Sequence, residues 1–212
     1  MRLEGSPADA HRPEIRGSLA RSLAGQLELT RQLGVVTALG RGWRLWEGDG
    51  LWPPRAHSPI FDFAATTPGA EAIDVLAAQG KAGIGGPGEL QVGHSDWRAE
   101  HVRFVGSEVA VVYDWDSLDL STETRLVGTA AATFTANREL AVPGAPTPDE
   151  SRAFVDDYSA ARARPLSRAE RKEIAAVTLY LVAYSARCAH ALGRGGDFVE
   201  ALERFGADYL VP

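Results

Sequence analysis

Apolar side chains recur three or four positions apart along most of the chain, which is the period of an α-helix. The first run begins Ile15, Leu19, Leu23 and predicts a helix over about residues 13–34. Pro13 suits the first turn of this helix, where a missing N–H breaks no hydrogen bond. Similar patterns predict further helices over about residues 67–80, 122–137, 148–163, 167–191 and 197–205.

The centre of the chain has a different pattern. Residues 102–105 and 109–113 are two runs rich in β-branched residues, and Gly106-Ser107-Glu108 separates them. Such a pair predicts a β-hairpin. Residues 89–93 predict one more short strand, and the Gly- and Pro-rich residues 40–59 predict an irregular loop. The predicted fold class is therefore α+β, mainly α, with a helical body around a small central β-hairpin.

Domain organisation follows from the same patterns. Residues 1–12 are polar and are expected to form a flexible N-terminus, while residues 13–212 are expected to form a single domain. A chain of 212 residues lies within the range of one large domain.

Charge and cysteine content narrow the function classes. The chain has 22 Lys and Arg against 28 Asp and Glu, a net charge of −6. This balance argues against nucleic-acid binding and against an anionic membrane surface, because both require a basic face. No window approaches eighteen consecutive apolar residues, so no membrane span is expected. The single cysteine, Cys188, cannot form an intrachain disulfide, and residues 1–9 lack the apolar core of a signal peptide, so we expect a cytoplasmic protein.

The segment from residue 94 to residue 116 concentrates the side chains that could carry chemistry. It holds His94-Ser95-Asp96, then His101, then the predicted hairpin, then Asp114-Trp115-Asp116. Carboxylates that are crowded together repel one another unless a cation or a proton lies between them. The segment therefore predicts a divalent-metal site at the ends of the hairpin.

The order of these residues resembles the catalytic centre of the aminoglycoside phosphotransferase and choline kinase family, which shares its core with protein kinases. In that pattern an H-x-D begins the catalytic loop, an Asn follows five residues after the Asp, and a hairpin leads to a second, metal-binding Asp. Here Asp96 matches the first Asp, His101 occupies the Asn position and Asp114 matches the second Asp. Residues 113–117 and 184–190 also resemble this family, and the resemblance covers roughly residues 14–195.

The resemblance implies an ATP- and Mg²⁺-dependent phosphorylation of a small-molecule hydroxyl. Asp96 would be the catalytic base, and Arg98 would supply positive charge near the transferred group. Asp114 and His101 would hold the metal and through it the nucleotide, with Asp116 as a further metal ligand. In family members that accept aminoglycosides, carboxylates of the helical region bind the cationic amines. Four residues could have that role, and the sequence does not choose among them: Glu150, Asp156, Asp157 and Glu200.

Two departures from the family pattern keep other interpretations open. An imidazole at His101 is a poorer Mg²⁺ ligand than the amide of Asn. Before residue 90 there is no strand pair with a glycine-rich loop, and neither Lys81 nor Lys172, the only lysines, lies in a predicted strand. The chain would then correspond to the C-terminal lobe of a kinase-like fold without the nucleotide-binding N-terminal lobe, truncated or inactive alone. The surface exposed by the missing lobe would favour a homo-oligomer.

The rival interpretations are a non-catalytic kinase-like binding module and, less favoured, a metal-dependent hydrolase. A hydrolase would use the mixed nitrogen and oxygen ligands of this segment, which suit Zn²⁺ or Mn²⁺ better than Mg²⁺.

Overall fold

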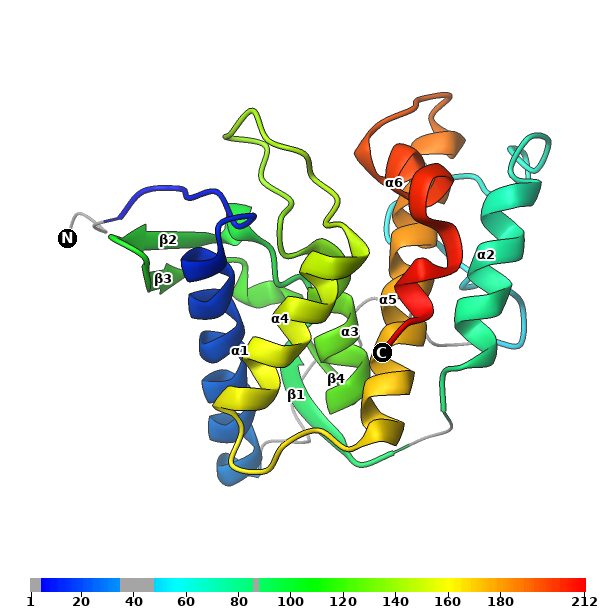
Figure 1. Cartoon of the computed structure of the whole chain (residues 1–212). Helices are drawn as coiled ribbons and strands as arrows, with labels where there is room; N and C mark the ends of the chain where they lie inside the picture. Colours follow the sequence, from blue (N-terminus) through cyan, green and yellow to red (C-terminus); the bar gives the residue numbers. More distant parts are fainter. Residues whose placement is uncertain (1–4, 35–47, 86–87) are drawn as a thin grey trace.

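A computed structural model describes residues 5–34, 48–85 and 88–212. The described chain is mainly helical, with two small two-stranded antiparallel sheets, which confirms the predicted α+β class (Figure 1). Its elements in chain order are α1 (Pro13–Leu33), α2 (Glu71–Ala82), β1 (Leu90–His94), the 3₁₀ turn η1 (Ala99–His101), β2 (Val102–Val105), β3 (Glu108–Val112), η2 (Trp115–Ser117), β4 (Leu118–Thr122), α3 (Glu123–Thr133), α4 (Pro148–Ala161), α5 (Arg168–Ala191), α6 (Asp197–Phe205) and η3 (Gly206–Leu210).

The predicted hairpin is confirmed as β2 and β3, which pair antiparallel from Val102 opposite Val112 to Val105 opposite Glu108. Each predicted helix is present, and the described part of the predicted loop, residues 48–59, contains no helix or strand. Residues 40–47 of that loop lie outside the described residues.

The sequence did not predict β4, which pairs antiparallel with β1 so that His94 lies opposite Leu118. The predicted helix over residues 122–137 is shorter in the structure, mainly because it ends at Thr133. It begins at Glu123, where the side chain of Thr122 caps it by accepting a hydrogen bond from the backbone N–H of Arg125. Both strands of this second sheet lead directly to or from the segment with the candidate site residues.

Residues 5–12, expected to be flexible, instead pack against the body of the protein. Ser6 forms a β-bridge to Phe104, and Ala10 is buried in the core. The ring of His11 contacts a carboxylate oxygen of Glu150 at 2.7 Å and the carbonyl oxygen of Pro143 at 2.9 Å. These contacts tie the segment to the hairpin and to α4, a long-range pairing that a polar composition does not reveal.

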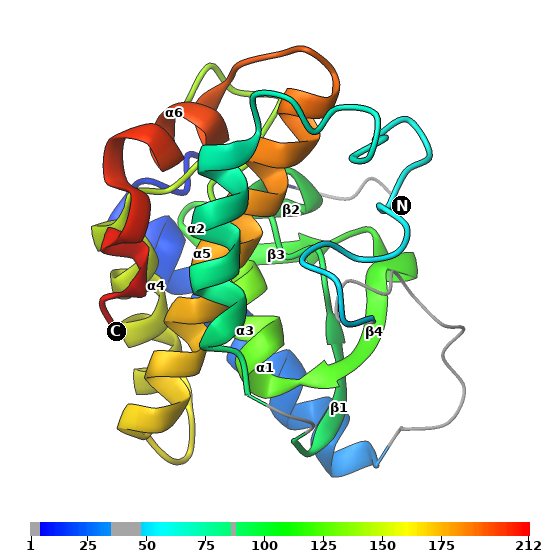
Figure 2. The same ribbon diagram turned by 90° about the vertical axis from the view of Figure 1, so that its right-hand side faces the viewer.

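The core consists of two clusters of buried apolar side chains. One lies among α1, α3, α4 and the hairpin and includes Leu19, Trp97 and Phe154. The other surrounds α5 and includes Ile73 from α2 and Leu202 from α6. Figures 1 and 2 show α5 lying between α3 on one side and α2 with α6 on the other.

Two glycines allow neighbouring helices to approach α5 closely. A Cβ added to Gly80 of α2 would lie 2.8 Å from the backbone nitrogen of Tyr180, and one added to Gly128 of α3 would lie 2.5 Å from the Cβ of Val177. Both contacts are far inside ordinary van der Waals distance, so no larger residue fits without moving a helix. Backbone on both sides therefore holds α5 in place.

Within the described ranges, α5 is also the one helix that is long and apolar enough to cross a membrane, with a mean hydropathy of 1.2 over its most apolar window. Of that window, 78% is buried inside the protein. A buried core helix of a soluble protein has the same length and composition, so this feature is weak support for a membrane span.

Candidate metal centre and adjoining cavity

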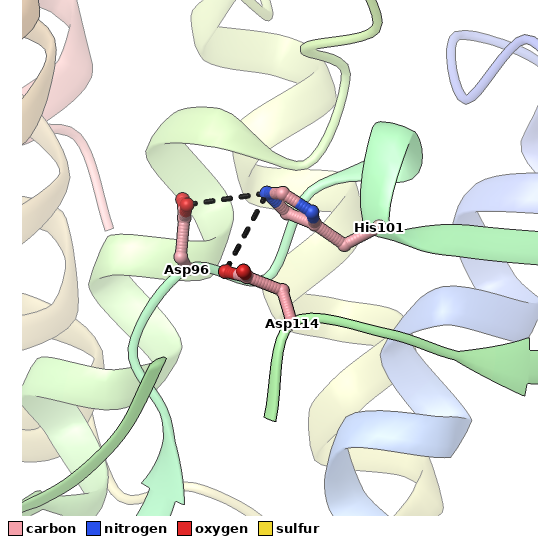
Figure 3. Close-up of side chains that lie close together, drawn as sticks. All are labelled: Asp96, His101 and Asp114. Atoms are coloured by element: carbon pink, nitrogen blue, oxygen red, sulfur yellow. Dashed lines mark hydrogen bonds and ion pairs between the residues drawn. The ribbon is translucent and has the colours of Figure 1, made fainter. Parts of the chain in front are cut away.

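Asp96, His101 and Asp114 lie together, with one ligand atom from each side chain within 4.8 Å of the others (Figure 3). The Nε2 of His101 is 3.2 Å from Oδ2 of Asp96 and 3.9 Å from Oδ2 of Asp114. The hairpin produces this proximity, because His101 precedes β2, Asp114 follows β3, and the backbone N–H of Tyr113 donates to the carbonyl of His101 at 2.8 Å. The three residues that match the family pattern therefore lie together, although the sequence assigned the metal to Asp114, His101 and Asp116 and gave Asp96 the role of base.

His94 connects the segment that carries Asp96 with the segment that carries Asp114, through hydrogen bonds to the backbone of each. Its Nδ1 accepts a hydrogen bond from the backbone N–H of Asp96 at 3.2 Å, so the proton of the neutral ring lies on Nε2, which donates to the carbonyl oxygen of Tyr113 at 3.0 Å. The side chain is almost fully buried, and this burial lowers the pKa of His94 below its ordinary value. A neutral imidazole therefore supports the loop backbone.

Arg98 lies beside the cluster and is in contact with two carboxylates. One guanidinium nitrogen is 2.6 Å from Oδ2 of Asp96, and the other is 2.9 Å from Oε1 of Glu100. Burial alone would raise the pKa of Asp96, but its contacts with His101 and Arg98 outweigh burial and hold the pKa below the ordinary range. Asp96 is consequently ionised at neutral pH.

The Nε2 of His101 has two competing neighbours. Arg98, which can only donate, lies 2.8 Å from this nitrogen, and the Asp96 carboxylate, which can only accept, lies 3.2 Å from it. One nitrogen can satisfy only one of them at a time. With its lone pair on Nε2, the imidazole accepts from Arg98, and the same guanidinium nitrogen also lies 2.6 Å from Oδ2 of Asp96. Two carboxylates and an imidazole are a donor set that divalent metals accept, but a metal bound to both Asp96 and His101 would displace Arg98 from this position.

Asp114 is the one non-glycine residue with positive φ in the part of the chain that the structure describes, at φ 61°. Asp tolerates this left-handed conformation better than most residues, at a cost of about 1 kcal/mol or more. The turn is closed by the hydroxyl of Ser117, which donates to Oδ2 of Asp114 at 2.5 Å. The strained backbone turns the carboxylate toward His101, and such strain is typical of functional sites.

Asp116, the third predicted ligand, does not join this cluster. It is exposed, and its carboxylate is not among the three groups that approach one another. Asp116 instead lines a neighbouring cavity of about 370 Å³, together with Asp96 and Arg98.

The opposite wall of this cavity comes from elements far along the chain. Thr129 and Thr133 of α3, Tyr184 and Ser185 of α5, and Phe198 of α6 contribute to it, as does His57 from the loop before α2. The backbone N–H of His57 donates to the hydroxyl of Tyr184 at 3.1 Å, and burial lowers the pKa of His57. The cavity thus lies between the candidate metal centre and α5.

Sequence reasoning missed two residues near this centre. Glu100 is only 13% exposed in its side chain, and its Oε1 lies 3.7 Å from Nε2 of His101. Glu100 directly precedes His101 in the sequence, and this position could have indicated that it lies at the site. His57 had no local signal, since tertiary packing brings its loop to the cavity.

No family model matches this chain, and no curated protein matches it either. Among solved structures, the chain is similar to a crystal structure from Ralstonia eutropha JMP134 that is provisionally described as an aminoglycoside phosphotransferase. The two are 16% identical, with a TM-score of 0.48 over 98% of this chain and 70% of that one. These values are too low to assign the chain to a family.

Proposed function

We propose that this chain is a metal-dependent phosphotransferase that transfers a phosphoryl group from a nucleotide to a hydroxyl of a small molecule. The observation that carries the proposal is the convergence of Asp96, His101 and Asp114 within 4.8 Å, with Asp96 also lining a cavity. The order of these residues along the chain, with a hairpin between the second and third, is the order that kinase-like phosphotransferases use.

In this proposal Asp114 and His101 hold a divalent cation, with Mg²⁺ as the expected physiological ion, and Asp96 stays available to act on the acceptor. A bound Mg²⁺ would supply charge neutralisation for the phosphates of ATP. The Asp114 carboxylate provides a hard oxygen ligand, which Mg²⁺ prefers. The imidazole is a softer ligand, so affinity for Mg²⁺ is expected to be modest.

Asp96 is the proposed base for the acceptor. It is ionised, it lines the cavity, and it can accept the proton of a hydroxyl that attacks the phosphorus. Arg98, 2.6 Å from this carboxylate, would place its positive charge near the transferred phosphoryl group and so stabilise the transition state. As the acceptor oxygen bonds to the phosphorus, the bond from that phosphorus to the departing nucleoside diphosphate would break and the hydroxyl proton would pass to Asp96.

Nucleotide binding would depend mainly on the metal. In the described part of the chain before β1 there are two helices and a loop, and no strand pair encloses a glycine-rich turn. The adenine and the outer phosphates would therefore be held weakly by these residues.

Self-association through the hairpin face, predicted from the sequence, stays a prediction.

One observation favours a second candidate, a metal-dependent hydrolase. The imidazole nitrogen of His101 within the cluster suits Mn²⁺ or Zn²⁺ better than Mg²⁺. Such an enzyme would need no nucleotide, whereas a binding module without catalysis would need none of the three ligands.

Calorimetric titration with ATP, in the presence and absence of Mg²⁺, separates these functions. We expect nucleotide binding that requires Mg²⁺. This binding should be lost in Asp114→Asn, because the variant removes the charge that holds the metal. The fold should be retained, because Asn keeps the side-chain shape and tolerates positive φ. Asp149→Asn is the matched control, because it removes an equal charge from an exposed position on α4 that does not line the cavity. Nucleotide binding that is independent of Mg²⁺ and of Asp114 would contradict the proposal, and tight Mn²⁺ or Zn²⁺ binding without nucleotide would favour the hydrolase.

A further inference from the structure

We infer that the chain has a second ligand site, remote from the candidate metal centre, which takes a free amino acid with a cationic side chain. The site is a cavity of about 540 Å³ among α1, α3, α4 and α5. None of the residues named for the proposed function lines this cavity, so the two proposals stand independently.

The cavity and the candidate metal centre lie at opposite ends of the sheet formed by β1 and β4. Gln91, near the start of β1, and Thr122, at the end of β4, line the cavity. At the other end of the sheet His94 pairs with Leu118, and His94 contacts the backbone of Asp96. The volume of this cavity lies within the range of small-molecule pockets, about 300–1,000 Å³.

Two hydrogen-bond donors on side chains that line the cavity have no partner among the described residues. They are Nε2 of Gln91 and Nη1 of Arg162. Gln91 is 7% exposed, and the side chain of Arg162 is 11% exposed. A buried donor without a partner is costly, so each of these groups requires an acceptor. A ligand oxygen bound in the cavity would provide it.

The pleat of β1 directs Gln91 toward the cavity. Gly93, two residues further along, lies on the same face of the strand as Gln91. A Cβ added to Gly93 would lie 2.6 Å from a methyl carbon of Leu27 on α1 and 2.5 Å from one of Leu126 on α3. Gln91 therefore points between α1 and α3, where the cavity lies.

The surroundings of Arg162 suit a carboxylate. Glu123 accepts hydrogen bonds from the Tyr158 hydroxyl at 2.5 Å and from Arg31 at 3.1 Å. Nη2 of Arg162 also donates to Glu123, at 2.8 Å, so Nη1 of the same guanidinium stays available. The cavity adjoins the N-terminus of α3, the positive end of the helix dipole, where the capping residue Thr122 lines it. A guanidinium, an amide and a helix N-terminus together favour an anionic oxygen.

The glutamates of the cavity wall supply the opposite charge. Five glutamates line the cavity against three arginines. Three of the five pair with those arginines, namely Glu28, Glu123 and Glu170.

The other two are Glu89 and Glu173. Glu173 accepts from the backbone N–H of Gly85 at 3.1 Å and lies near Arg125, while Glu89 is exposed and makes no ion pair with a described residue. Even with Arg125 counted, the glutamates outnumber the arginines. A ligand with one carboxylate and two cationic groups matches this balance, and a basic amino acid is such a ligand.

Saturation-transfer NMR titration of the full chain, without nucleotide, tests the inference with three matched probes. Lysine carries all three charged groups, cadaverine lacks the carboxylate, and norleucine lacks the side-chain ammonium. We expect lysine to bind about tenfold or more tightly than either of the others, because hydrogen bonds to charged groups are the strong ones. Lysine that bound no more tightly than cadaverine or norleucine would overturn the inference. So would the absence of binding by all three, which would show that water alone satisfies these donors.

Variants test whether lysine binds in this cavity. Glu89→Gln should reduce the affinity for lysine to about that for norleucine, whereas Glu203→Gln, at an exposed position on α6, should not. Gln91→Met removes the amide donor and should weaken lysine and norleucine binding but not cadaverine binding. Asp116→Asn, in the cavity beside the candidate metal centre, should leave lysine binding unchanged.

An unchanged lysine affinity in Glu89→Gln would overturn the inference, as would loss of lysine binding in Asp116→Asn. Because Glu89 is exposed, its variant keeps the test decisive if Gln91→Met does not fold.

Discussion

The buried ring of His94 lies 3.0 Å from the carbonyl oxygen of Tyr113, the residue that precedes Asp114. Because the other nitrogen of the ring accepts from the backbone N–H of Asp96, one side chain fixes the spacing of the Asp96 and Asp114 carboxylates. His94 is thus a positioning residue, which orients ligands without being one.

Replacing His94 should weaken metal binding although the metal is not touched. We expect His94→Ala to lower the affinity for Mn²⁺ by about 10–100-fold and stability by about 1–3 kcal/mol, because two buried backbone groups lose their partner. Calorimetry and urea unfolding measure the two effects. His94→Gln, whose amide N–H can replace the Nε2 donor, should restore part of the affinity. If both variants bound Mn²⁺ like the wild type, the positioning role would be wrong.

The identity of the side chain at position 101 should set the metal preference. The Nε2 of His101 is the one nitrogen ligand among the three candidate groups. His101→Asn supplies an amide oxygen, so the ratio of Mn²⁺ to Mg²⁺ affinity should fall on the order of tenfold. Metal titrations by calorimetry give this ratio, and Asp116→Asn should leave it unchanged. A ratio that stayed constant in His101→Asn would exclude His101 as a ligand.

The pair formed by His11 and Glu150 should make stability depend on pH. The hydrogen bond to Glu150, the largest influence, raises the pKa of His11 from 6.5 to about 9, although burial opposes it. A raised pKa means that protonated His11 contributes fully below pH 6.5 and that this contribution is lost as pH rises through about 9. Burial would raise the pKa of Glu150, but its hydrogen bonds with His11 and Thr147 lower it to about 2. The carboxylate therefore contributes above pH 4.5 and loses its contribution toward pH 2.

Urea unfolding across this range measures the effect of the pair. The contribution of this pair to the free energy of unfolding of the wild type should be greatest between about pH 4.5 and 6.5. It should decline by about 1–2 kcal/mol toward pH 9, after allowance for solvent screening. His11→Gln should flatten the alkaline slope, and adding Glu150→Gln should change that slope no further. An identical alkaline slope in wild type and His11→Gln would refute this assignment.

The close crossing of α3 and α5 should not tolerate a methyl group. A Cβ at Gly128 would lie 2.5 Å from the Cβ of Val177 and 2.9 Å from the carbonyl oxygen of Ile174, so Gly128→Ala should cost about 1–3 kcal/mol. Gly25 of α1 is the matched control, because its added Cβ meets no atom within 4 Å. Gly25→Ala should stabilise the protein by about 0.5–1 kcal/mol. Denaturant midpoints give both values, and equal effects would contradict the packing argument.

Local patterns predicted most of the fold, and long-range pairing accounts for what they missed. Helical spacing located α1 and α5 closely, and the β-branched runs located the hairpin. β4 was missed because Leu118–Thr122 is short and partly polar, and its partner β1 lies on the other side of the hairpin in sequence. The contact between His11 and Glu150 spans 139 positions, so no window of sequence contains it.

In the candidate site, too, sequence spacing located some residues and could not locate others. Asp96, His101 and Asp114 could be found from their spacing around one hairpin. The first and last residues of a hairpin lie side by side, so residues that precede it and follow it come close together. The competition of Arg98 and Asp96 for one nitrogen of His101 depends on side-chain positions that spacing cannot give. The wall of the cavity required the packing of α3, α5 and α6 against the loop before α2.

The tight seating of α5 bears on how this protein could diversify. Because backbone from two neighbours meets it at Gly80 and Gly128, the face that carries Tyr184 and Ser185 cannot shift to suit a new compound. Residues 48–70, which include His57, form no helix or strand, and side-chain hydrogen bonds such as those of His57 to Tyr184 and of Arg187 to Phe63 connect them to α5. Evolution toward other acceptors would therefore proceed by exchanging side chains on a fixed floor and by remodelling this loop, while the helical frame stays constant.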